Sequence, residues 1–138
     1  MAYNLGEIQP GAYVIKATAS APITKGYFVV IPPTGTAVAL YAGAKPGGVI
    51  GVALDAASAS GDVIRVCIDG MVSVQCDATG VDAFDFVASS ETGTAGVADL
   101  EADYVLGIAL DVGAAGGVAL IKLNQITGIL GATAAGSS

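Results

Sequence analysis

The sequence contains no histidine and no tryptophan, and only five of its 138 residues are lysine or arginine. Without imidazole, a chain cannot build a Ser-His-Asp triad, a Cys-His dyad or most zinc sites. Twelve carboxylates give a formal net charge of -7, and five scattered cations cannot line a phosphate backbone. We therefore expect a protein that is not an enzyme, holds no metal or cofactor and binds no nucleic acid.

An uninterrupted apolar run of membrane-spanning length is also missing. Residues 26–44 carry no charge, but Pro32 and Pro33 interrupt them, and a turn inside lipid would leave backbone groups unpaired. The first residues show no cationic segment followed by an apolar one, so we expect no secretory signal, no membrane partner and synthesis in a cytoplasm. In that compartment Cys67 and Cys76 are expected to be free thiols with a structural role.

Phosphate loops and nucleophile elbows are absent, and the acidic residues offer one further candidate site. Asp99, Glu101 and Asp103 are spaced two apart, so an extended chain would put their oxygens on one side, where calcium could bind. An EF-hand loop would have glycine at the sixth position, where this sequence has Tyr104. A solvated acidic loop is the favoured interpretation, and calcium ligation is the alternative.

The sequence contains an internal repeat. The segment VIGVALDA at residues 49–56 returns as VLGIALDV at residues 105–112, and the tetrapeptide TGTA occurs upstream of each copy. The offset between the copies drifts from 58 to 56 residues, which indicates a two-residue deletion in a loop. Two copies are too few for a solenoid. We expect pseudo-repeats at about residues 25–68 and 83–123.

Alternating apolar residues between Gly, Pro, Asp and Ser predict short strands throughout the chain. Asp69 and Gly70 predict a two-residue hairpin turn between strands at residues 63–68 and 71–75. The expected fold is all-β, a compact β-barrel or sandwich of short strands. The expected organisation is an extended N-terminal arm at residues 1–11, one β domain at residues 12–125 and a C-terminal tail at residues 126–138.

The ordered motifs resemble a known family. They are the first repeat motif, then GDVIRV at residues 61–66, GMV at residues 70–72, LGIALD at residues 106–111 and GGV at residues 116–118. Over about residues 10–123 this set is similar to the small capsid cement, or head decoration, proteins of tailed phages. At residues 83–85 this chain has Ala-Phe-Asp, where Ala-Gly-Asp is common in the family, so a bulkier residue is expected in that turn.

The resemblance implies a non-enzymatic, usually trimeric protein on the outer capsid surface, where neighbouring major capsid proteins meet. We expect it to bridge capsid subunits and to stabilise the shell against the pressure of packed DNA. The residues expected to contact the capsid are Tyr3, Asn4 and Leu5, and those expected to pack between subunits are Ile126, Ile129 and Leu130. The alternatives are a ligand- or carbohydrate-binding β-domain of a phage or bacterial surface assembly, or an enzyme that uses two carboxylates, such as a glycosidase.

Overall fold

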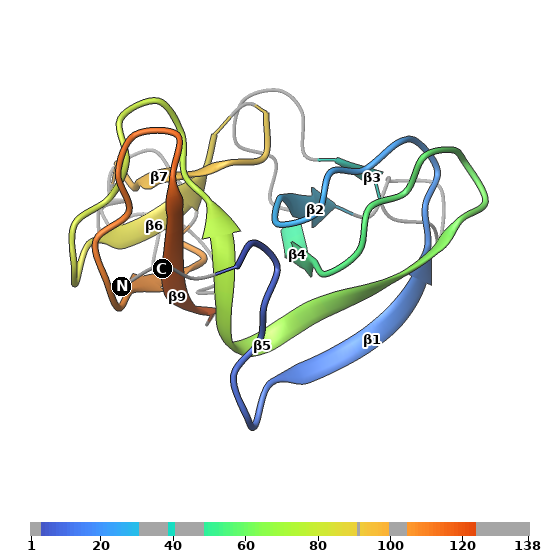
Figure 1. Cartoon of the computed structure of the whole chain (residues 1–138), viewed down its shortest axis with the longest axis horizontal. Helices are drawn as coiled ribbons and strands as arrows, with labels where there is room; N and C mark the ends of the chain where they lie inside the picture. Colours follow the sequence, from blue (N-terminus) through green and yellow to red (C-terminus); the bar gives the residue numbers. More distant parts are fainter. Residues whose placement is uncertain (1–3, 31–38, 41–48, 91, 100–104, 124–138) are drawn as a thin grey trace, which may run out of the picture.

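The computed structural model describes residues 4–30, 39–40, 49–90, 92–99 and 105–123. Within these ranges no residue is helical, and one antiparallel sheet curls into a nearly closed, barrel-like shape (Figure 1). The all-β prediction is confirmed. The strands are β1 (Tyr13–Thr18), β2 (Phe28–Val30), β3 (Ala39–Leu40), β4 (Val49–Ala53), β5 (Val63–Gln75), β6 (Phe86–Ser89), β7 (Ala95–Val97), β8 (Gly107–Ala109) and β9 (Val118–Leu123).

The strand pairing is duplicated in the same way as the sequence. The sheet order is β3-β2-β4-β5-β9-β8-β6-β7, which is symmetric when β2, β3, β4 and β5 are matched with β6, β7, β8 and β9. The register agrees as well: Val29 pairs with Gly51 in the first repeat, and Val87 pairs with Gly107 in the second. Each repeat therefore forms the same four-stranded unit, and the two units join where β5 pairs with β9.

The hairpin predicted at Asp69 and Gly70 is wrong, because β5 continues through both residues as one strand of 13 residues. Its first half pairs with β1 and β4, and its second half pairs with β9. Gly70, at φ 104°, bends the strand without reversing it, so that β5 passes from one unit to the other (Figure 1). Partner strands on both sides of the bend outweigh the local preference of Asp-Gly for a tight turn.

The two units contribute opposite faces to the shared core. In the first unit, Phe28 and its cross-strand partner Val52 are fully buried in the central cluster. In the second, Val87 is in that cluster, whereas Phe86, which corresponds to Phe28, is 38% exposed and its partner Ile108 is half-buried. The other face of the first unit packs in a separate cluster with β1. Within the described ranges, the first unit is thus covered on both faces, while the second keeps one face open.

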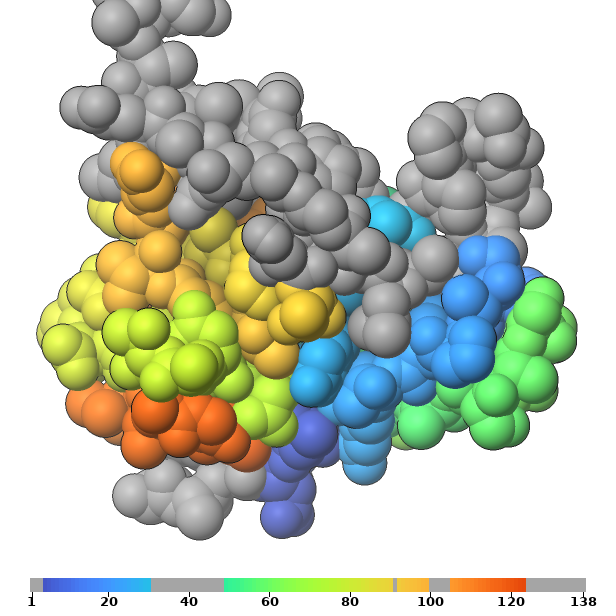
Figure 2. All heavy atoms as spheres, turned by 90° about the horizontal axis from the view of Figure 1, so that it is seen from above, coloured from blue at the N-terminus to red at the C-terminus, as the bar shows by residue number. Residues whose placement is uncertain are grey.

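The space-filling view shows the two repeats on different sides of the molecule (Figure 2). The yellow and orange segments of the second repeat gather on one side, together with the yellow-green segment that follows the bend of β5, and the light blue and green segments of the first repeat lie on the other.

The segment predicted as an extended arm runs along β5 where the structure describes it. Ile8 forms an antiparallel bridge with Val72. The Gly6 N–H donates to the Ser73 carbonyl at 3.0 Å, and the Ser73 N–H donates to the Glu7 carbonyl at 2.9 Å. The sequence pattern showed no partner strand for this segment, because a single apolar residue, Ile8, carries the pairing.

Candidate interaction surface

The residues predicted to contact a capsid, Tyr3, Asn4 and Leu5, belong to this N-terminal segment. Tyr3 is outside the described residues, and Asn4 is exposed. Leu5 is half-buried, and its side chain lies where a Cβ on Gly26 would stand. Leu5 therefore packs on its own domain. The residues predicted to pack between subunits, Ile126, Ile129 and Leu130, lie outside the described residues.

The candidate calcium ligands are described only in part. Asp99 is exposed, and Glu101 and Asp103 lie outside the described residues. Among the residues that the structure describes, no three His, Cys, Asp or Glu side chains are grouped so that they could hold a metal ion.

In the same part of the chain, no helix is long and apolar enough to span a membrane.

The two cysteines are free, as predicted, and both are buried. Burial raises the pKa of both thiols, because the thiolate would lose its hydration. A carbohydrate-binding surface would need exposed aromatic side chains. Of the five tyrosines, the structure describes Tyr13, which is 62% exposed, and Tyr27, which is half-buried.

Asp55 and Asp111 follow β4 and β8 at equivalent places but have different partners. Arg65 Nε and Nη2 donate to the Asp55 carboxylate at 3.0 and 2.9 Å, and the Arg65 backbone N–H donates to it at 3.0 Å. The side-chain hydrogen bond from Arg65 lowers the pKa of Asp55 to about 2. Asp111 accepts from the N–H of its neighbour Val112 at 2.8 Å. The two aspartates therefore occupy equivalent ends of two different strands and do not form one site together.

The turn before β6 corresponds, bond for bond, to the turn before β2. The Asp85 N–H donates to the Asp82 carbonyl, as the Tyr27 N–H does to Thr24. At the third position of each turn φ is positive: 85° for Gly26 and 72° for Phe84. The bulkier residue that the sequence places in this turn is accommodated without loss of the turn.

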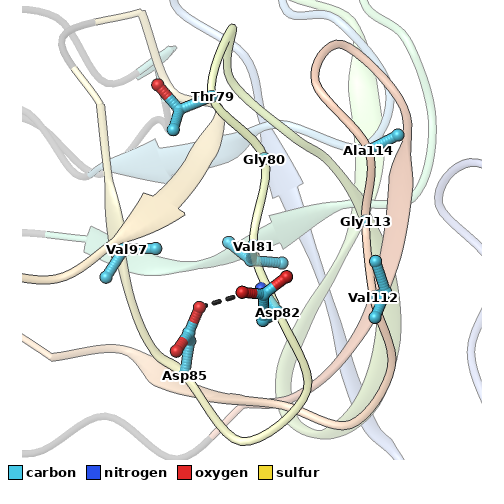
Figure 3. Close-up of a pocket in the computed structure, with 9 residues that line it drawn as sticks. All are labelled: Thr79, Gly80, Val81, Asp82, Asp85, Val97, Val112, Gly113 and Ala114. Carbon is cyan, nitrogen blue, oxygen red and sulfur yellow. Dashed lines mark hydrogen bonds between the residues drawn. The ribbon is translucent and has the colours of Figure 1, made fainter.

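An open hollow of about 240 Å³ lies beside this second turn (Figure 3). Two carboxylates, Asp82 and Asp85, lie between Val97 on one side and Val112 on the other. The Asp82 N–H donates to Asp85 Oδ2 at 2.8 Å, which orients that carboxylate. Within the described residues, no cation pairs with either aspartate. As far as the described residues show, the hollow thus combines apolar walls with two carboxylates that no cation pairs.

Two exposed apolar side chains, Val97 and Val112, line the hollow, and two more, Phe84 and Phe86, lie next to its aspartates in the chain. Phe84 is 77% exposed, Val112 59%, Val97 53% and Phe86 38%. They come from the turn, the segment after β8, and strands β7 and β6, which are far apart in sequence. Sequence reasoning marked Phe84 only as an unusual turn residue. It could not place Val97 and Val112 beside one hollow, because the tertiary fold brings these two residues together.

No family model and no curated protein matches this chain. Among solved structures, the head fiber gp8.5 N base in bacteriophage phi29 matches with a TM-score of 0.59 and 15% sequence identity. The match covers 85% of this chain and 99% of that chain. At this identity the likeness concerns the fold alone: the duplicated β domain described above has the same fold as that head fiber base.

Proposed function

We propose that this chain is a structural protein of a phage virion, a capsid cement or decoration protein that acts by contact and not by turnover. The observation that supports this best is the fold shared with a head fiber base over most of the chain. The sequence motifs that resemble cement proteins support the same class independently. The exposed apolar side chains of the second repeat support a protein that binds another protein.

In this proposal the protein is made in the host cytoplasm and binds major capsid proteins on the outer surface of the shell as a homotrimer. Each subunit that spans neighbouring capsid proteins adds contacts that must break before the shell opens under DNA pressure. Three linked binding surfaces bind more tightly than one, because after the first contact the others form at high local concentration. Contacts that are modest individually then suffice for stable decoration.

The proposal is tested with purified protein and capsids of the same phage that lack it. We expect the protein to sediment with the capsids and to raise the temperature at which they release DNA. Sedimentation velocity of the free protein at micromolar concentration tests the trimer. Failure to sediment with capsids, at low salt and in molar excess, would contradict the proposed function.

The N-terminal residues are the proposed capsid contact. We expect the double variant Tyr3→Ala/Asn4→Ala to weaken co-sedimentation, because Asn4 is exposed and supports no described element. Unchanged binding would remove these residues from the contact and leave the rest of the proposal standing.

A further inference from the structure

The duplication provides an internal control for deciding which side chains the fold requires. The bridge between Val81 and Gly113 in the second repeat corresponds to the bridge between Ile23 and Ala57 in the first. The bond from the Phe84 N–H to the Ala109 carbonyl, 2.7 Å, corresponds to that from Gly26 to Ala53, 2.8 Å. Both repeats therefore build one backbone framework around this turn.

The side chains on that framework differ between the repeats: the second repeat has carboxylates and larger apolar groups where the first has none. The first repeat has Thr24 and Tyr27 where the second has Asp82 and Asp85. It has Gly26 where the second has Phe84, and Ala56 where the second has Val112. The first repeat forms this framework without two carboxylates and two exposed apolar groups. In the second repeat the Asp85 carboxylate accepts one N–H of the turn, whereas no described hydrogen bond of the turn uses the carboxylate of Asp82, and the Phe84 and Val112 side chains are exposed.

Phe84 also has an energetic cost at its position. A side chain at positive φ is strained by about 1 to 2 kcal/mol, and only glycine avoids this strain. The Phe84 ring is 77% exposed, so burial within the chain does not offset the strain. Strain that the fold neither needs nor compensates points to a contact outside the chain.

The chemistry of the hollow identifies the kind of contact. Its walls include Val97 and Val112, and its charge comes from Asp82 and Asp85, with no cation paired to either in the described part of the chain. A lysine or arginine side chain fits this combination, because its aliphatic stem packs on apolar groups while its cation meets carboxylates. An acidic partner segment or a nucleic acid would be repelled.

We propose that the 82–85 turn and the hollow beside it bind a basic segment of a partner protein. In this complex an arginine or lysine of the partner lies between Val97 and Val112 and pairs with Asp82 and Asp85. The Phe84 ring covers an apolar residue next to that cation. The assignment of the partner as the major capsid protein rests on the proposed function, whereas the chemistry of the segment does not.

The first test uses two blocked peptides, Leu-Arg-Leu-Arg-Leu and the same peptide with Glu for Arg, titrated into the 15N-labelled full chain. We expect the arginine peptide to shift the backbone amide signals of Phe84, Asp85, Val97 and Val112, and the glutamate peptide to leave them in place. Asp82→Asn should weaken this binding severalfold, and Phe84→Gly about tenfold. Asp69→Asn is the matched control, since it removes the same charge from an exposed residue of β5. Scattered shifts, or equal affinity in all three variants, would overturn the inference.

The second test repeats these variants in capsid co-sedimentation at two salt concentrations. Loss of binding by Phe84→Gly and Asp82→Asn but not by Asp69→Asn, with weaker binding at high salt, supports a capsid partner for this surface. Wild-type binding that none of the variants changes overturns the capsid assignment while the proposed function stands. A wild-type protein that binds the arginine peptide but no capsid refutes the proposed function and supports the inference.

Discussion

Phe84 and Gly26 occupy the same position of the two repeats and have the same backbone conformation, with φ of 72° and 85°. Each donates its N–H to the strand across the turn, to Ala109 and to Ala53. Phe84 is the only described residue other than glycine with positive φ. The second repeat therefore keeps the backbone conformation typical of glycine at a position occupied by phenylalanine.

Replacing Phe84 with glycine is expected to stabilise the protein by about 1 kcal/mol, because it relieves the strain of positive φ and removes an exposed ring. Urea denaturation measures this as a higher midpoint at unchanged slope. Phe84→Ala is the control: it removes the ring but keeps a Cβ at positive φ, so most of the strain stays. A lower midpoint for the glycine variant would show that the ring supports the fold.

The ion pair between Asp55 and Arg65 should make stability depend on pH in the acid range. The folded-state pKa of Asp55 lies at about 2, below the ordinary value of 3.8, so the ionised form is favoured in the folded state. Its contribution is present above pH about 4 and is lost as the pH falls towards 2. Because both side chains are substantially exposed, at 39% and 53%, we expect only about 0.5 kcal/mol.

Carbon-detected NMR titration of the Asp55 carboxyl measures this pKa directly. In Arg65→Met the pKa should rise towards its ordinary value, since the cation and the side-chain donors are removed while the backbone N–H stays. A titration curve that does not differ between wild type and Arg65→Met would contradict the assigned cause.

Gly113 is expected to tolerate no side chain. A Cβ there would overlap Cys76 Sγ and lie 2.6 Å from Ala119 Cβ, and both neighbours are buried. Gly113→Ala should cost about 1 to 3 kcal/mol through overpacking, measured by thermal or urea unfolding. The double variant Gly113→Ala/Cys76→Ala should recover part of the loss. Ala57 holds the equivalent place in the first repeat, so a neutral result would mean that the second repeat can relax to the same spacing.

Cys67 and Cys76 should be unreactive in the folded protein. Both are buried, at 0% and 2% exposure, and burial raises the pKa of each thiol, so little thiolate is available. With an aromatic disulfide reagent at pH 8 we expect slow modification that follows unfolding, and two thiols titrated at once in denaturant. Rapid reaction of one thiol under native conditions would show local opening around that residue.

The sequence by itself determined the fold class and the duplication, because both depend on local signals. Alternating small apolar residues between turn formers predict strands, and VIGVALDA and VLGIALDV predict that the second half repeats the first. The prediction of free cysteines rested on the expected compartment and not on a local pattern, and both cysteines are free in the structure. At the 83–85 turn, the sequence also marked Phe84, which among the described residues other than glycine is the one with positive φ.

Only the tertiary structure decided how the strands are joined and which faces are covered. Asp69 and Gly70 favour a hairpin locally, yet β5 continues through them as one bent strand, because β1, β4 and β9 supply hydrogen bonds along its whole length. Alternation of apolar and polar residues along a strand distinguishes its two faces, but it does not show which face another layer will cover. The charge of Lys122, which pairs with Ile108, is the sequence signal that could have marked the open face of the second unit. Phe28 and Phe86 occupy equivalent positions of the two repeats, yet Phe28 is buried and Phe86 is exposed. The local pattern is the same for both, so packing between distant segments decides which of the two side chains is removed from water.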